Sequence, residues 1–168
     1  MDFYTEISKT ATQLAKACLK TGKLLAVAES CTGGWLSKSL TDLAGSSEWF
    51  DGGFVTYSNE AKINMISVQK DSLESYGAVS EQVVIEMARG VLAHTKASFS
   101  VAISGIAGPG GGTEEKPVGL VWFAFVNNNK GEFTVSTEQH IFNGNRNDIR
   151  GQAVLQALAG LLKIAKLN

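Results

Sequence analysis

Apolar residues recur at helical spacing in several stretches of the chain. In residues 2–21 they occur every three or four positions and are followed by Gly22, which predicts an amphipathic helix ending there. The same spacing predicts a helix after Gly34, one over residues 80–95, and one from the turn at residues 143–147 to the end of the chain.

Other stretches have the patterns of strands. Leu24–Ala28 and Phe99–Ile103 are apolar without interruption, which is typical of strands covered on both faces. Residues 49–57 predict a third strand, interrupted by a glycine pair. A β-hairpin is predicted late in the chain, with strands at 120–126 and 132–142 and a turn at Asn127–Gly131.

The order of these elements indicates the fold class. Helices alternate with buried strands early, and the hairpin comes late. This pattern predicts an α/β fold, a three-layer α/β/α domain with a mixed sheet. The chain has 168 residues and contains no repeat, low-complexity tract or linker, so we expect residues 1–168 to form a single domain.

Composition narrows the class of protein. Hydrophobic residues make up 44% and charged residues 18%, as in globular proteins, and a net charge of −1 indicates no nucleic-acid or membrane partner. No apolar run approaches the roughly 18 residues of a membrane span, and the N-terminus has no signal-peptide pattern. Cys18 and Cys31 form no C-x-x-C motif, which favours a reducing compartment. We therefore expect a cytoplasmic protein.

The segment after the first predicted strand, residues 28–34, is the first candidate for chemistry. Ser30 follows the carboxyl end of the strand, where open α/β sheets place their ligands. The N–H groups of residues 31–34 at the following helix start suit an anion, or an oxyanion that forms beside Ser30. Two alternatives stay open: Ser30 or Thr32 caps the helix, or Cys31 is the nucleophile, although we expect a small buried cysteine there.

Lys62 is the candidate base. Ser58 or Asn59 is predicted to cap a short helix ending at Ile66, which places Lys62 in the first turn, where the helix dipole disfavours an ammonium. Partial burial acts in the same direction, and a serine–lysine hydrolase needs a neutral lysine. A solvated surface lysine is the alternative. Tyr57 either orients Lys62 or transfers a proton, or it only packs.

A glycine-rich loop, residues 105–112, follows the second buried strand. Consecutive glycines let a backbone approach a ligand closely, but the loop is neither a Walker loop nor a G-x-G-x-x-G turn. Arg146, at the start of the last helix, combines a guanidinium with free N–H groups and suits a phosphate. The alternatives are a loop too long to be rigid and a surface salt bridge of Arg146. His94 and His140 lack metal-ligand spacing, so no metal is expected.

Five stretches together resemble one family: residues 28–35 (AESCTGGW), 44–50 (AGSSEWF), 53–62 (GFVTYSNEAK), 77–81 (GAVSE) and 104–119 (SGIAGPGGGTEEKPVG). They are similar to the C-terminal domain family of the competence/damage-inducible protein CinA, which includes stand-alone nicotinamide-nucleotide amidases. The resemblance extends from about residue 5 to residue 165.

The resemblance implies deamidation of nicotinamide mononucleotide to nicotinate mononucleotide and ammonia, without metal or cofactor. The family serine falls on Ser30, the lysine on Lys62 and the motif tyrosine on Tyr57. The resemblance also implies that the protein forms homodimers or larger homo-oligomers. We expect no pyrophosphatase activity, since the second domain of full-length CinA proteins is lacking. Contacts to the substrate are expected from Cys31, Thr32, Gly33, Gly34, Ser104, Gly105, Gly108, Gly110 and Arg146.

The chain departs from the family at one position. The family often reads G-D-R before the last helix, whereas this chain has Asn145 before Arg146, so we expect Arg146 to be held less firmly. Two competing functions remain: a module that binds a pyridine nucleotide without turnover, and an amidohydrolase that depends on Cys31.

Overall fold

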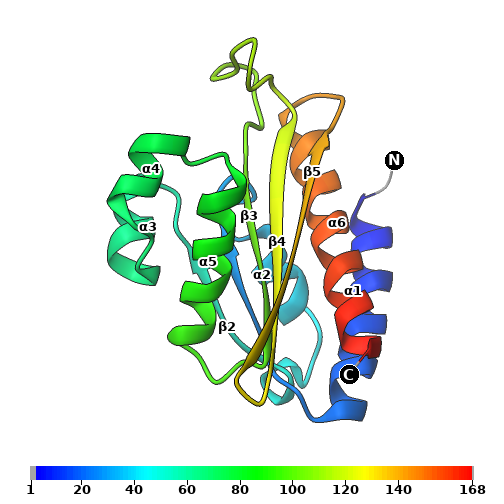
Figure 1. The fold of residues 1–168 in the computed structure, drawn as a ribbon. Helices are drawn as coiled ribbons and strands as arrows, with labels where there is room; N and C mark the ends of the chain where they lie inside the picture. Colours follow the sequence, from blue (N-terminus) through cyan, green and yellow to red (C-terminus); the bar gives the residue numbers. More distant parts are fainter. Residues whose placement is uncertain (1–2, 168) are drawn as a thin grey trace.

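The computed structural model describes residues 3–167 and has the predicted alternation of helices and strands (Figure 1). The helices are α1 (Phe3–Thr21), α2 (Trp35–Thr41), α3 (Asn59–Ile66), α4 (Lys70–Tyr76), α5 (Glu81–Ala93) and α6 (Arg146–Leu167), with a short 3-10 helix η1 (Ser46–Glu48). The strands are β1 (Leu25–Glu29), β2 (Phe50–Val55), β3 (Phe99–Gly105), β4 (Leu120–Asn129) and β5 (Glu132–Ile141). The predicted first helix began at residue 2, which lies outside the described residues.

The five strands form one mixed sheet in the order β2-β1-β3-β4-β5. β1 pairs in parallel with β2 and β3, whereas β4 pairs antiparallel with β3 and with β5. The predicted α/β class with a mixed sheet is therefore confirmed. The carboxyl ends of the three parallel strands lie together at the upper end of the sheet in Figure 1.

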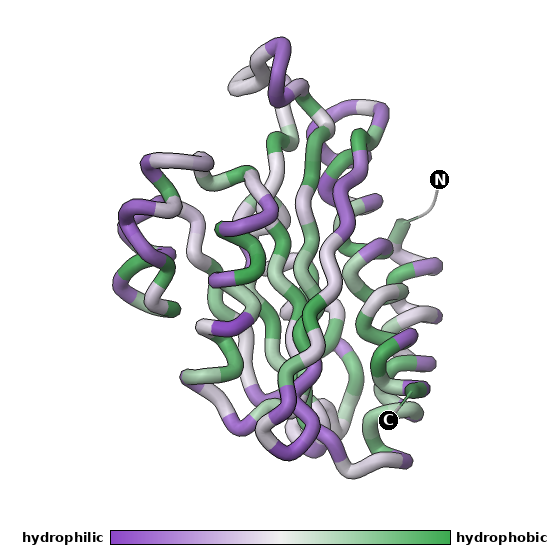
Figure 2. Tube along the Cα trace, in the orientation of Figure 1, coloured by the Kyte–Doolittle hydropathy of each residue, from purple (hydrophilic) through white to green (hydrophobic). Residues whose placement is uncertain are grey.

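Helices cover both faces of the sheet. α1 and α6 lie on one side with α2, and α5 lies on the other with α3 and α4 (Figure 1). All five residues of β1 are buried, and they alternate: Leu25 and Val27 pack on the α1/α6 side, and Ala26 and Ala28 on the α5 side. The central strands are accordingly mostly green, the colour of hydrophobic residues, in Figure 2. Burial on both faces explains why β1 and β3 are uninterrupted apolar runs.

Two local predictions differ from the structure. Helix α4 was not predicted, because Leu73 is the only buried residue in it and a single apolar position gives no periodicity. The hairpin turn is shorter than the predicted Asn127–Gly131, since β4 continues to Asn129. The two turn residues, Lys130 and Gly131, both have positive φ (55° and 95°), as a two-residue type I′ turn requires.

The second glycine of the pair in the predicted 49–57 strand has a packing role. A Cβ at Gly53 would overlap the hydroxyl oxygen of Ser37, so the glycine lets α2 lie against β2.

None of the helices in the described part of the chain combines the length and apolar character needed to cross a bilayer.

Candidate functional site

A pocket of about 260 Å³ lies where β1, β2 and β3 end. Most of the predicted site residues line it: Ser30, Cys31, Tyr57, Lys62, Ser104, Gly105, Gly108, Gly110 and Arg146. Thr32, Gly33 and Gly34 do not. Thr32 is fully buried, and the two glycines line a separate cavity together with Trp35 and Arg150. The structure thus brings the predicted serine, lysine and tyrosine together and separates them from Gly33 and Gly34.

Lys62 reaches Ser30 from helix α3. Ser58 caps this helix by accepting a hydrogen bond from the N–H of Ala61 at 3.0 Å, so Lys62 lies in the first turn. Its Nζ is 3.1 Å from Ser30 Oγ and 2.7 Å from the carbonyl oxygen of Thr56. Only 1% of Lys62 is exposed, which excludes the alternative of a solvated surface lysine.

Burial brings the pKa of Lys62 closer to neutral pH. Removal of the ammonium from water lowers the pKa of Lys62 from 10.5 to about 8. Among the described residues, Ser30 Oγ and Thr56 O are the hydrogen-bond partners of Nζ, so a protonated amine would have a third N–H without an acceptor. A neutral amine instead donates to Thr56 O and presents its lone pair to the hydroxyl of Ser30.

Glu29 organises the turn that carries Ser30. This carboxylate, the last residue of β1, is fully buried. It accepts five hydrogen bonds from the start of α2, donated by Thr32 Oγ1, Ser37 Oγ and the N–H groups of Gly34, Leu36 and Ser37, at 2.7–3.1 Å. Neither Ser30 nor Thr32 caps α2, because the buried carboxylate supplies the acceptors that a cap residue would supply.

Two of the four N–H groups that were predicted to bind an oxyanion already donate hydrogen bonds within the protein. The N–H of Gly34 donates to Glu29, and the N–H of Gly33 donates to Ser30 O at 3.0 Å. The expectation that residues 31–34 all offer free N–H groups is therefore wrong at Gly33 and Gly34. No acceptor is found among the described residues for the N–H groups of Cys31 and Thr32.

Cys31 is a buried thiol, as expected. Burial raises its pKa from 9.0 to about 12, despite the helix start that follows. A thiol with this pKa contains almost no thiolate near neutral pH, so it is a poor nucleophile. Its carbonyl oxygen accepts a hydrogen bond from Arg150 Nε at 3.1 Å.

Arg146 lines the pocket and links Tyr57 to the glycine-rich loop. Its guanidinium donates to the carbonyl of Gly108 at 2.7 Å and to the hydroxyl of Tyr57 at 3.0 Å. The phenol of Tyr57 is bonded to Arg146, and no described hydrogen bond joins it to Lys62. The glycine-rich loop is thus tied to α6. Lys116, four residues beyond the loop, donates from Nζ to the carbonyl oxygen of Tyr76 at 2.6 Å.

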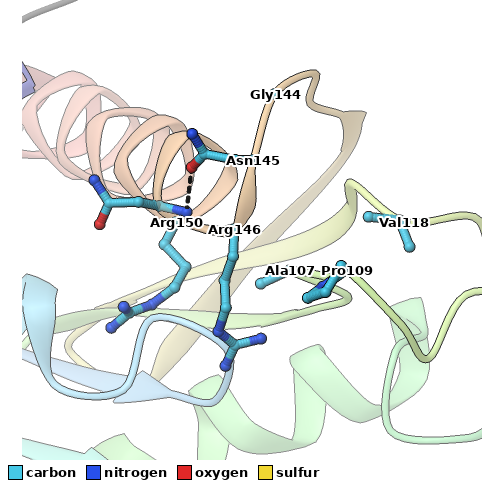
Figure 3. A pocket seen from close by; sticks show the side chains of 8 residues that line it. Ala107, Pro109, Val118, Gly144, Asn145, Arg146 and Arg150 are labelled. Atoms are coloured by element: carbon cyan, nitrogen blue, oxygen red, sulfur yellow. Dashed lines mark hydrogen bonds between the residues drawn. The ribbon is translucent and has the colours of Figure 1, made fainter.

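The start of α6 differs from its predicted role. The side-chain oxygen of Asn145 accepts the N–H of Asn147 (Figure 3). It also accepts the N–H of Asp148, and the carboxylate of Asp148 accepts the N–H of Asn145. These N–H groups are not free to bind phosphate, which corrects the expectation for this helix start. The side chain of Asn145 caps the helix and forms no described hydrogen bond with the side chain of Arg146, so its replacement of the family's aspartate leaves the two contacts of Arg146 intact.

Arg146 and Arg150 lie side by side at this helix start. Figure 3 shows both side chains leaving the first two turns of α6 in the same direction. Both line a cavity of about 470 Å³ that also includes Ala107, Pro109 and Val118. Because Arg146 lines this cavity and the pocket of Ser30, the two spaces adjoin.

Three groups of the site were missed from the sequence. Glu29 had a local signal, an acid between a buried strand and a helix start, where N–H groups lack partners. The sequence gives no signal for the carbonyl of Thr56 or for the side chain of Arg150. In the case of Arg150, no local pattern links it to Cys31, 119 residues earlier. Within the described residues, no three His, Cys, Asp or Glu side chains gather as metal ligands would.

Comparison with known proteins assigns the family. A family model described as "CinA C-terminal domain" matches residues 7–165. The chain belongs to the CinA C-terminal domain family. The resemblance drawn from the sequence motifs is therefore confirmed.

Relatives of the CinA family cover nearly the whole chain. The protein named nicotinamide-nucleotide amidohydrolase PncC from Escherichia coli (strain K12) is 52% identical over 157 residues, which cover 94% of this chain and 93% of the relative. A protein of the same name from Pseudomonas putida is 42% identical and covers 94% and 96%.

Solved structures of the family share the fold. The competence/damage inducible protein CihA from Agrobacterium tumefaciens is 41% identical, with a TM-score of 0.88 over 95% of both chains. A CinA superfamily protein from Klebsiella pneumoniae is 38% identical, with a TM-score of 0.89 over 96% of this chain and 99% of the other.

Proposed function

We propose that this CinA-family protein is an amidohydrolase that converts nicotinamide mononucleotide to nicotinate mononucleotide and ammonia, with Ser30 as nucleophile and Lys62 as base. The observation that carries this proposal is the 3.1 Å contact between Lys62 Nζ and Ser30 Oγ inside a pocket. The names of the PncC relatives supply the substrate class. In line with the family, we propose that the enzyme needs no metal or cofactor and acts in the cytoplasm as a homo-oligomer.

The reaction proceeds in two halves. Neutral Lys62 takes the proton of the Ser30 hydroxyl, and Oγ attacks the carbonyl carbon of the carboxamide. The N–H groups of Cys31 and Thr32 stabilise the oxyanion. Protonated Lys62 then returns the proton to the amide nitrogen, ammonia leaves, and an acyl-serine ester remains. Water attacks the ester with Lys62 again as base, which releases the carboxylate product.

Groups remote from the reacting bond hold the nucleotide. Arg146 and the glycine-rich loop, joined through the carbonyl of Gly108, bind ribose and phosphate, since a guanidinium matches the geometry of a phosphate. Tyr57 is 59% exposed at the pocket, and its contact with Arg146 fits a role in orienting this guanidinium. Binding energy from the phosphate then serves to orient the carboxamide at Ser30.

Ammonia release tests the proposal directly. Incubation with nicotinamide mononucleotide should release ammonia, Ser30→Ala should lose at least about 10³-fold in rate, and Cys31→Ala should stay within about threefold. Ammonia and nicotinate mononucleotide are measured together. Binding without ammonia would favour a pyridine-nucleotide-binding module, and loss of activity in Cys31→Ala alone would favour a cysteine mechanism.

The pH dependence of kcat/KM tests the role of Lys62. The base is the deprotonated amine, and its pKa in the folded protein is about 8. Below this value kcat/KM should rise about tenfold per pH unit, and above it kcat/KM should level off. Measurements between about pH 6.5 and 9.5 avoid the second ionisation of a phosphate near pH 6. A flat profile over this range would contradict the assignment of Lys62 as base.

A further inference from the structure

The backbone N–H groups around the nucleophile are almost all used within the protein. Those of Gly33 and Trp35 donate to carbonyl oxygens of the turn, and those of Gly34, Leu36 and Ser37 donate to the Glu29 carboxylate. In the part of the chain that the structure describes, this leaves the N–H groups of residues 31 and 32 without an acceptor. They directly follow Ser30, so they are the groups left for a substrate.

Arg150 holds the opposite end of one of these two peptide groups, the carbonyl of Cys31, and also the carbonyl of Thr32. From the first turns of α6, its Nε donates to Cys31 O at 3.1 Å and its Nη2 donates to Thr32 O at 2.8 Å. The guanidinium also lies 5.5 Å from the ring centroid of Trp35, which fixes its plane. Arg150 forms no ion pair with a described carboxylate, so its charge acts on these two carbonyls without a neutralising partner there.

The contact has an electronic consequence for the free N–H groups. The carbonyl of Cys31 and the N–H of Thr32 belong to one peptide unit. A cation bonded to the carbonyl oxygen withdraws electron density from the unit and makes its N–H a stronger donor. Two bonds from one planar guanidinium also fix the orientation of this peptide plane and of the next one, which joins Thr32 to Gly33.

We propose that Arg150 is a positioning residue that aligns and polarises the turn after Ser30, so that the N–H groups of Cys31 and Thr32 donate hydrogen bonds to the developing oxyanion. This inference rests on the proposed role of Ser30. Arg150 acts through the backbone of the turn and does not contact the substrate. It is distinct from Arg146, which contacts Tyr57 and the glycine-rich loop.

Variants of Arg150 test the proposal by the division between kcat and KM. Arg150→Ala should lower kcat about 10- to 100-fold with KM within about threefold, because misplaced donors weaken transition-state stabilisation only. Arg150→Lys should be nearly as slow, since one ammonium cannot reproduce a two-pronged contact. Lys38→Ala is the matched control: Lys38 lines the same cavity as Arg150 but pairs with Asp42, so kcat should not change.

Chemical rescue and a covalent probe complete the experiment. Guanidinium, below denaturing concentrations, should restore part of the kcat of Arg150→Ala and leave Lys38→Ala unaffected, because the cavity admits the small cation. A fluorophosphonate that modifies Ser30 should label Arg150→Ala at least about tenfold more slowly than the native protein, as followed by intact mass. This reagent reports on the turn whatever the natural substrate is, so its result separates a failure of this inference from a failure of the proposed amidase activity.

Three results would overturn the inference. The first is a native kcat and labelling rate in both Arg150 variants. The second is a raised KM with native kcat, which would make Arg150 a substrate-binding residue. The third is slow turnover that falls in parallel with the amount of folded protein measured by circular dichroism. Arg150→Lys keeps the charge and the aliphatic stem, so slow turnover in a folded Arg150→Lys protein would show that the loss in Arg150→Ala does not come from unfolding.

Discussion

Replacement of Lys62 by Met is expected to lower the rate of ammonia release by about 10³-fold or more and, at the same time, to stabilise the protein. The loss follows because Met removes the only amine within hydrogen-bonding distance of Ser30 Oγ among the described residues. The gain follows because the native side chain is 1% exposed, and the lowering of its pKa from 10.5 to about 8 measures the cost of burying the charge.

The size of the stability gain depends on pH. The shift corresponds to about 3 kcal/mol at pH 7, and the lost hydrogen bond to Thr56 O offsets about 1 kcal/mol, so we expect a net gain of about 2 kcal/mol. Native Lys62 takes up a proton on unfolding between about pH 8 and 10.5, so native stability rises with pH there. The advantage of Lys62→Met should therefore shrink over that interval.

Urea unfolding at pH 7 and pH 10, together with the ammonia assay, measures both effects. Lys9→Met is the matched control, because Lys9 is a surface lysine of α1 whose side chain is 65% exposed. It should change neither the rate nor, by more than about 0.5 kcal/mol, the stability. An active Lys62→Met protein would remove the base from the proposed mechanism, whereas an inactive but less stable one would contradict only the account of burial.

The sequence predicts those parts of the fold and site that depend on local pattern. β1 and β3 are buried on both faces, so each contains an uninterrupted apolar run. Ser30 follows directly after β1, and Ser104 lies next to the end of β3. Ser58 could be predicted as a cap because Ser is a strong N-cap residue, and its position then places Lys62 in the first turn of α3.

The parts that sequence reasoning missed depend on contacts between distant segments. Helix α4 packs through Leu73 alone, which leaves no periodic signal. The occupied N–H groups at the start of α6 were misjudged because a helix start alone does not show which side chains turn back onto it. Glu29 presents the same problem at α2, since its acceptors reach eight residues along the chain to Ser37.

Glu29→Gln is expected to have the second large effect, on stability as well as on turnover. The carboxylate has two acceptor oxygens that receive five hydrogen bonds, whereas a carboxamide has one acceptor oxygen and an NH₂ group that faces donors. At least one backbone N–H of α2 then lies buried without an acceptor. We expect a loss of about 3 kcal/mol, and a fall in kcat of about 100-fold because the turn carrying Ser30 shifts.

Asp42→Asn provides the comparison, because Asp42 ends the same helix in an exposed ion pair with Lys38. That change should stay within about 0.5 kcal/mol and leave kcat unaltered. Denaturant unfolding gives the stabilities, and kcat is referred to the folded fraction measured in the same buffer. Native stability and native kcat in Glu29→Gln would show that α2 and the Ser30 turn hold their geometry without the carboxylate. Because Glu29 is buried and Asp42 is exposed at the two ends of the same helix, the comparison separates the effect of burial from the effect of removing a negative charge.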